Sequence, residues 1–520
     1  MTISLHSSGG RHLPTTTNYV EKLISQMFME EMSHNRKRIE RQFKEKIMIV
    51  IDQRGCGQGK TTDGIYKRIR ANKQNNIKSL VVVPSIKLQE QYKKDLDFPV
   101  EVINSHIYNE DSSDFNTTIQ ACLHNMKKGT DIIIITHQAF VKLPMTGHKI
   151  KYDLIIDEAL DDIIRKTDVA SVNNEAWQPD YDLYNLFEFE NNIVEKTVEI
   201  TKDDDEEWHQ LHQFREPTQG LLSDSPSFKN ITDKNFVHHV TSKGWHILNG
   251  QDGGIAHVIS TLNPDILKNW RAVYIAAAAF TYTKMYHWMM FNKFQYYTPK
   301  EYRFVEHIGN IKLFTSDNHK FDWSNNKRKT YPEILNKYHE QVKQHASGEV
   351  ITVRNNSETQ NLGDIEVRLN HNVHGMNDLQ EYKDISLETA LIPDPQVKKF
   401  IIDNWLVNFN KENQKRAITH MFSAYLFYQV IMRTGLRSKD YNNERINIFV
   451  LDQNTGVCLM DYFEEVTEIG EMDITSDIPL KKRGAPIKYD TDEARKQAKK
   501  ASDKKRYEAK KLRKIGRAHV

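Results

Sequence analysis

A glycine-rich turn between an apolar run and a helix-forming segment constrains this 520-residue chain more than any other feature. Residues 47–51 are apolar and predict a buried strand, and residues 61–72 have helical spacing. Glycine leaves backbone N–H groups unobstructed, and a helix N-terminus attracts anions. The turn, here called the phosphate loop, therefore predicts a nucleotide phosphate site. It consists of Gly55, Cys56, Gly57, Gln58, Gly59, Lys60 and Thr61, and Thr62 follows it.

The charged and hydroxyl groups of the phosphate loop suit ATP and Mg²⁺ as cofactors. Lys60 can reach the β- and γ-phosphates, and the Thr61 hydroxyl can ligate Mg²⁺. Arg54 departs from the usual pattern G-x-x-x-x-G-K-(S/T), because it stands where the first glycine is expected. The alternative is a glycine-rich turn that binds no ligand.

Further apolar runs without polar alternation lie at 80–83, 132–135, 154–156 and 273–276. Such runs are typical of strands buried on both faces of a parallel sheet. A helical stretch at 86–96 separates two of them, so strand and helix alternate, which predicts an α/β fold. A second apolar series runs from 350–353 to 446–451, and 520 residues exceed what one core usually organises.

We therefore expect several domains. A helical lead covers 1–40, and a first α/β domain covers 41–330 with an insertion at about 161–269. A second α/β domain covers 335–470. The acidic cluster at 203–207 in the insertion is read as a solvated loop rather than a metal site.

Two carboxylates, Asp157 and Glu158, end the apolar run at 154–156. Ligands of open α/β sheets bind at the carboxyl ends of the strands, so both acids should face the phosphate loop. Asp157 is placed to hold Mg²⁺, mostly through water. Glu158 is placed to orient or deprotonate an attacking water.

With these motifs in order, the chain resembles the superfamily 2 helicases with DEAD-like boxes, whose two domains are RecA-like. Asp157–Leu160 is similar to motif II, as D-E-A-L. The resemblance implies contacts with the nucleic-acid backbone for two further segments, which contain Pro84, Ser85 and Gln91 (motif Ia) and Thr136 and His137. Residues 277–281 stand in the place of motif III but lack most of its hydroxyls, which puts its coupling role in doubt.

The second half of the chain resembles motifs V and VI of phage-type helicases. Residues 375–379 and 393–395 correspond to motif V, and residues 429–437 to motif VI. Arg433 and Arg437 are four residues apart, which predicts one helix face. An arginine on a second domain can neutralise charge on a transferring phosphoryl group. A pair of surface arginines is the alternative, and His371 and His374 are read as loop residues rather than metal ligands.

The C-terminal region 471–514 is basic. Residues 481–514 contain fifteen Lys and Arg against five Asp and Glu, whereas the whole chain carries only +2. The segment with Lys481, Lys482 and Arg483 resembles an AT-hook arm, which enters the minor groove by charge and shape. A tail that only aids solubility is the alternative. Residues 515–520 resemble a translated sequencing adapter, and we expect them to be an artefact.

Composition excludes other classes of protein. No run approaches the roughly 18 apolar residues of a membrane span, and the N-terminus lacks a secretory pattern. Three scattered cysteines argue against disulfides and structural zinc, and indicate the cytoplasm.

The resemblance thus implies an ATP-dependent helicase or translocase of phage replication or recombination. It would bind DNA rather than RNA, with replication-complex proteins as further partners. A DNA-packaging motor and an origin-binding ATPase switch are the alternatives.

Overall fold

The computed structural model describes residues 48–106, 117–144, 146–170, 187–189, 207–213, 226–248, 253–318, 323–355, 360–369, 379–437, 444–476 and 478. The expected lead at 1–40, most of the acidic cluster, His371, His374, nearly all of 375–379, and the basic tail from residue 479 onward lie outside these ranges. In the part of the chain that is described, no helix is long and apolar enough to cross a membrane.

The first sheet has seven parallel strands in the order β12-β1-β11-β5-β2-β4-β3. All five apolar runs expected to be strands lie in it, which confirms that prediction. The strands are β1 (Ile49–Asp52), β2 (Lys78–Val83), β3 (Glu101–Val102), β4 (Ile132–Thr136), β5 (Tyr152–Asp157), β11 (Ala272–Ala276) and β12 (Tyr296–Tyr297).

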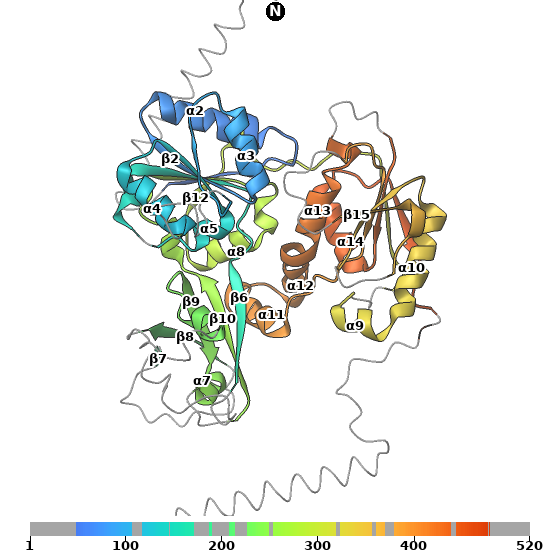
Figure 1. Ribbon diagram of the computed structural model, residues 1–520. Coiled ribbons are helices and arrows are strands. Elements are labelled where there is room, and N and C mark those ends of the chain that lie inside the picture. Colours follow the sequence, from blue (N-terminus) through green and yellow to red (C-terminus); the bar gives the residue numbers. More distant parts are fainter. Residues whose placement is uncertain are drawn as a thin grey trace, which may run out of the picture.

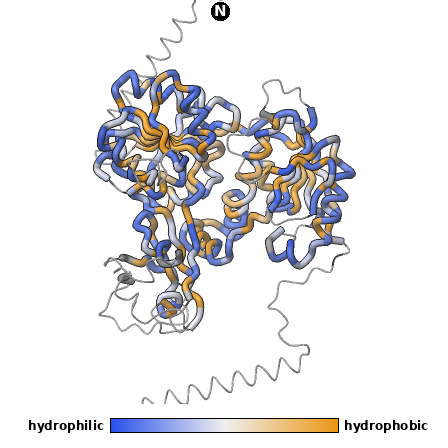
Figure 2. Tube along the Cα trace, in the orientation of Figure 1, coloured by the Kyte–Doolittle hydropathy of each residue, from blue (hydrophilic) through white to orange (hydrophobic). Residues whose placement is uncertain are grey.

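Helices cover both faces of the first sheet, because alternate side chains of its central strands are apolar on each side. One face packs against η1 (Lys60–Tyr66), α2 (Lys67–Gln74) and α3 (Ile86–Asp95). The other packs against α4 (Thr118–Lys128), α5 (His137–Val141) and α8 (Lys284–Phe291). Figure 2 shows the resulting apolar layer through the sheet.

The second sheet is antiparallel, in the order β6-β10-β9-β8-β7, and all its strands lie in the sequence between β5 and β11. Figure 1 shows it projecting from the first sheet. Its elements are β6 (Ile164–Ala170), β7 (Phe187–Phe189), β8 (Trp208–Gln213), α6 (Pro226–Ile231), β9 (Phe236–Thr241), α7 (Ser242–Leu248) and β10 (Ile255–Leu262).

The third sheet has six parallel strands in the order β15-β14-β16-β17-β13-β18. Its strands are β13 (Ile311–Ser316), β14 (Val350–Val353), β15 (Glu366–Leu369), β16 (Asp384–Leu387), β17 (Ile446–Val450) and β18 (Glu468–Met472). Two parallel sheets with helices on their faces confirm the predicted α/β class. The third sheet, however, begins at β13, upstream of the boundary that we expected at residue 335.

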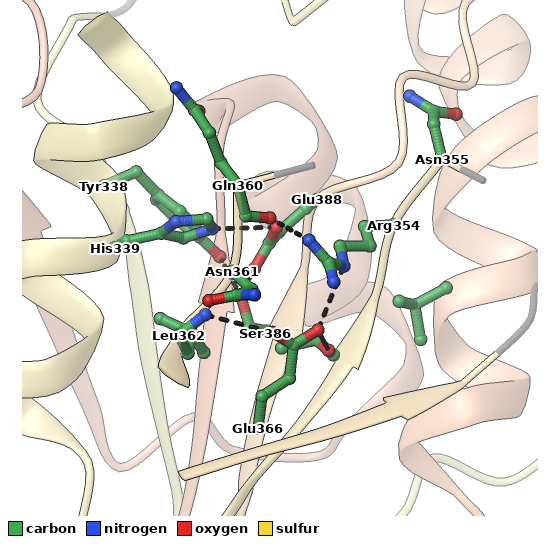
Figure 3. A network of polar contacts seen from close by, with 12 residues as sticks. Tyr338, His339, Arg354, Asn355, Gln360, Asn361, Leu362, Glu366, Ser386 and Glu388 are labelled. Carbon is green, nitrogen blue, oxygen red and sulfur yellow. Dashed lines mark hydrogen bonds and ion pairs between the residues drawn. The ribbon is translucent and has the colours of Figure 1, made fainter. Parts of the chain in front are cut away.

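One face of the third sheet packs against α10 (Pro332–His345), and the other packs against α13 (Tyr425–Ile431) and α14 (Gln453–Leu459). Figure 3 shows a buried polar network beside it. Arg354 Nε lies 3.0 Å from Glu366 Oε1, and His339 Nε2 lies 3.0 Å from Glu388 Oε2. These pairs tie β14 to β15 and α10 to the end of β16.

A helical segment of the second half packs back onto the first. It contains α11 (Pro395–Phe400), η10 (Ile401–Trp405), α12 (Lys411–Thr419) and η11 (His420–Ala424). Lys166 of β6 lies 2.8 Å from Asp394, and the Trp208 indole donates to Asp403 at 3.2 Å. The Trp208 ring meets Phe400 edge-on at 5.2 Å. The antiparallel sheet is thus joined to the segment that follows β16.

Candidate active site

The phosphate loop connects the carboxyl end of β1 to η1. Gly57 and Gly59 have φ of 79° and 78°, which is the left-handed region that favours glycine. A Cβ on Gly59 would also collide with the Asp63 carboxylate. The Lys60 ammonium donates to the carbonyls of Arg54 and Gly55, both at 2.8 Å. The Lys60 side chain therefore folds back over the loop whose amides it is expected to complement, and Thr61 and Thr62 follow Lys60 in the first turn of η1.

Arg54, the departure from the usual loop pattern, points away from the loop. Its guanidinium donates to both carboxylate oxygens of Asp52, at 2.9 and 2.6 Å, and lies 4.9 Å from the centre of the Tyr302 ring. The Tyr274 hydroxyl also donates to Asp52, at 2.8 Å. This hydrogen bonding raises the pKa of Arg54. Gly64 makes room for the cluster, since a Cβ there would meet Tyr274 and Asp52. Arg54 thus anchors the loop to β1.

The two predicted carboxylates lie at the same sheet edge as the phosphate loop. In the register of the sheet, Asp52 pairs with Ala276 and Ala276 pairs with Asp157, so one strand separates β1 from β5. Glu158 follows with φ of 67°, a strained value for a non-glycine residue, and its N–H donates to the Ala276 carbonyl at 2.9 Å. This turn directs Glu158 out of the strand.

Asp157 is buried, with 4% of its surface exposed. Burial raises the pKa of its carboxyl to about 7, and the neighbouring Glu158 charge adds to the shift. A hydrogen bond from Tyr92 and the charges of Lys60 and Arg433 oppose it. The cations of the loop and of the third-sheet unit therefore act on the same carboxylate.

These residues fit Mg²⁺ by the chemistry of their oxygen atoms. A hydroxyl at Thr61 and a carboxylate at Asp157 are hard ligands of the kind that Mg²⁺ takes alongside substrate phosphates. The Glu158 charge is among the causes that raise the pKa of Asp157, and a divalent cation would offset that repulsion. Among the described residues, no group of three or more His, Cys, Asp or Glu side chains could hold a metal.

Arg433 reaches this edge from the third-sheet unit, with its Nη2 atom 3.7 Å from Glu158 Oε1. The prediction that Arg433 and Arg437 share one helix face is wrong, because α13 ends at Ile431. The Arg433 and Thr434 amides bond to carbonyls three residues back, and the Thr434 hydroxyl donates to the Ile431 carbonyl at 2.6 Å. These bonds close the helix, and Arg437 lies on the separate 3-10 helix η12 (Gly435–Arg437).

A second contact crosses between the two units at Tyr428 of α13. Its hydroxyl accepts the Cys56 N–H at 3.0 Å and lies 2.8 Å from His307 Nε2. Burial lowers the pKa of His307 to about 4, with a further contribution from the Lys60 charge, so the imidazole is neutral. The Tyr428 ring stacks on Tyr462 at 4.5 Å. The phosphate loop thus touches an aromatic cluster of the second half.

The segment in the place of motif III also meets that cluster. Ala278 and Ala279 are buried against the α13 core, and the Ala279 N–H donates to the Gln53 carbonyl at 3.1 Å. This segment therefore provides apolar packing between the phosphate loop and the third-sheet unit.

The residues expected to contact nucleic acid occupy helix starts at the same edge. The Ser85 and Thr136 hydroxyls accept the N–H groups of Leu88 and Ala139, at 3.3 and 3.2 Å, and so cap α3 and α5. Val83, which precedes Pro84, pairs with Thr136. Both segments therefore lie side by side.

Two other residues expected to contact nucleic acid, Gln91 and His137, differ in exposure and in hydrogen-bond partners. Gln91 is on the surface of α3 and donates to Asp95 at 3.4 Å. His137 Nε2 lies 2.9 Å from the Asp157 carbonyl. Sequence reasoning did not select Tyr92, Tyr428 or His307, since nothing in their local pattern marks them.

The comparisons with known proteins come from solved structures. No protein-family model and no curated protein matches the chain. The structure of S. tokodaii Xpd4 is similar at 14% identity and a TM-score of 0.42, covering 82% of this chain and 96% of that one. A variant of S. cerevisiae Dbp5, bound to RNA and ADP BeF3, is similar at 9% identity and a TM-score of 0.32, covering 82% and 86%.

Proposed function

We propose that the chain is an ATP-dependent helicase or translocase that acts on DNA in phage replication or recombination. The observation that carries the proposal is the 3.7 Å approach of Arg433 to Glu158 between the units of the two parallel sheets. An arginine delivered to a carboxylate beside a phosphate loop is the arrangement by which one unit responds to the nucleotide on another. The basic tail supports a nucleic-acid partner by its charge.

The roles follow from the positions of the side chains. Lys60 exchanges the two loop carbonyls for phosphate oxygens, and the loop amides at Gly57 and Gly59 add neutral donors. The Gly55 amide, which donates to Gln58 Oε1 at 2.8 Å, adds a third donor only once it exchanges that bond for phosphate. Thr61 and Asp157 would hold Mg²⁺, which supplies neutralisation of phosphate charge when bound. The Glu158 carboxylate takes the proton of the attacking water.

Arg433 supplies the charge that responds to the nucleotide. Its guanidinium turns from Glu158 towards the negative charge that develops on the transferring group. A change in the position of the Arg433 guanidinium moves α13. Because Tyr428 lies on α13, the movement also alters its contact with the Cys56 amide. The nucleotide state thus shifts the population between a form with the Arg433–Glu158 and Tyr428–Cys56 contacts and a form without them. This alternation provides the motion of a motor.

A strand-displacement assay on tailed DNA duplexes tests the proposal. We expect ATP-dependent displacement by the full chain, and none by Lys60→Ala or Glu158→Gln. ATP hydrolysis stimulated by DNA without displacement or translocation would instead identify an origin-binding switch. The same assay on RNA duplexes tests the preference for DNA.

Deletion of residues 481–520 tests the role assigned to the tail. We expect lower DNA affinity and a shallower dependence on salt, because fewer phosphates are neutralised. Unchanged affinity at low salt would leave the tail with no part in binding.

A further inference from the structure

Tyr92 is a buried residue that the roles above do not use. None of its surface is exposed, and its hydroxyl donates to Asp157 Oδ2 at 2.7 Å. Burial and the nearby Asp157 charge raise its pKa well above the ordinary value, so the phenol stays protonated. A short hydrogen bond to a carboxylate is among the stronger ones in proteins.

The position of Tyr92 on α3 connects three parts of the site. Its ring meets Tyr66 of η1, the helix behind the phosphate loop, edge-on at 4.9 Å. One turn earlier, the buried Gln89 side chain donates to the carbonyls of Ile103 and Ile134, both at 3.1 Å. Helix α3 is therefore fixed against the sheet, and the Tyr92 hydroxyl is fixed with it.

A second contact holds the same aspartate by its backbone. Since a carbonyl only accepts, His137 Nε2–H donates to the Asp157 carbonyl at 2.9 Å. Side chain and main chain of Asp157 are thus held from α3 and α5, the two helices whose first residues carry the expected nucleic-acid contacts.

We propose that Tyr92 is a positioning residue for Mg²⁺: by holding Asp157 Oδ2 it fixes the direction in which Oδ1 faces. The inference rests on the proposed role of Asp157. Partners that orient a metal ligand typically change metal affinity by 10–100-fold when they are removed. The Tyr92 hydroxyl should therefore act on Mg²⁺ binding rather than on binding of the nucleotide alone.

The chain offers a matched control in Tyr66. It is the other ring of the pair, and its hydroxyl donates to Asp95 at 3.0 Å, whereas that of Tyr92 donates to Asp157. The experiment titrates Mg²⁺ into the full chain with a fluorescent ATP analogue and measures equilibrium binding, with EDTA as baseline. We expect Tyr92→Phe to raise the half-saturating Mg²⁺ concentration about tenfold. Tyr66→Phe should leave it within about twofold, and EDTA-baseline affinity should be unchanged in both.

Equal shifts in the two variants, or none in Tyr92→Phe, would overturn the inference and leave the proposed function standing. Asp157→Asn separates the two proposals, since it should raise the half-saturating Mg²⁺ concentration well beyond the shift of Tyr92→Phe. If Asp157→Asn leaves that concentration unchanged, both the metal site and the role of Tyr92 fail. The double variant Asp157→Asn/Tyr92→Phe should match Asp157→Asn alone, because Tyr92 acts through Asp157. A further loss in the double variant would contradict this.

Discussion

Arg433 Nη2 lies 3.7 Å from Glu158 Oε1, so a guanidinium of the third-sheet unit faces the carboxylate that follows β5. Both side chains are largely buried, with 12% and 19% of their surfaces exposed. The separation exceeds hydrogen-bonding distance, and the attraction is therefore mainly Coulombic. A phosphate that enters the site therefore competes with a charge pair whose 3.7 Å separation is too long for a hydrogen bond.

Replacement of Arg433 should act on turnover rather than on nucleotide binding. Arginines in this role accelerate phosphoryl transfer by about 10³–10⁵-fold. We expect Arg433→Ala to lower kcat of DNA-stimulated ATP hydrolysis by about 10³-fold, and Arg433→Lys to recover only part, because lysine lacks the planar fork. Steady-state hydrolysis and equilibrium binding of an ATP analogue measure the two effects.

Arg416→Ala is the control for this experiment. Arg416 is exposed on α12 and pairs with Asp461, away from Glu158. Its removal should leave kcat nearly unchanged. An equal fall in both variants would mean that Arg433 acts on the general stability of the unit.

Arg54→Gly restores the usual loop pattern, yet we expect it to destabilise the protein. It removes the main partner of Asp52, whose side chain is fully buried. Breaking a buried ion pair from one side costs about 3–5 kcal/mol. Urea unfolding measures the loss, and Asp52→Asn in the same chain should restore part of it. Unchanged stability of Arg54→Gly would show that Tyr274 alone satisfies Asp52.

The strands and the phosphate loop followed from local pattern. Uninterrupted apolar runs mark strands buried on both faces, and the register then brings Asp52 and Asp157 to one edge. β13 was not among the expected strands, because the charged Lys312 interrupts its apolar residues. Lys312 pairs with Glu468 of the neighbouring strand β18.

Contacts between distant segments were not predictable in the same way. The residues around Ile431 and Arg433 fit a continuing helix, and the chain stops there because of bonds made within the turn itself. The hydroxyls of Tyr92 and Tyr428 have roles only through Asp157 and Cys56, which pairing of elements far apart brings near. The local secondary-structure propensity of a segment does not predict hydrogen-bond partners that lie far away in the sequence.

His238 of the antiparallel sheet should make stability depend on pH. Burial lowers its pKa to about 4, helped by the Arg165 charge. Its Nε2–H donates to the Asp233 carbonyl at 3.1 Å, so Nδ1 accepts from the Ser260 hydroxyl at 2.8 Å. The unfolded chain binds a proton near pH 6.5 and the folded one only near pH 4. The contribution of His238 to the free energy of unfolding is therefore fully present above pH 6.5. It falls by about 3 kcal/mol as the pH is lowered from 6.5 to 4.

His238→Gln removes this titration and keeps an amide that can donate to the Asp233 carbonyl or accept from the Ser260 hydroxyl. Urea unfolding at several pH values between 4 and 7 should show a shallower slope for the variant. Parallel curves for the two proteins would assign the acid sensitivity to other groups.

The buried chain of polar groups at the end of β16 depends on Glu388, which is 2% exposed. Ser386 Oγ donates to Glu388 Oε1 at 2.7 Å and therefore accepts from the Tyr338 hydroxyl at 2.9 Å. His339 holds the other carboxylate oxygen at 3.0 Å. Glu388→Ala leaves these donors without an acceptor, and should cost about 3–5 kcal/mol in urea unfolding.

Glu388→Gln should cost less than half as much. Its amide oxygen accepts from Ser386, and its NH₂ group donates to His339 Nε2 in the other tautomer. The observed geometry requires only the two hydrogen-bonding atoms of Glu388. Equal losses of stability in the two variants would contradict this and show that the network requires the charge.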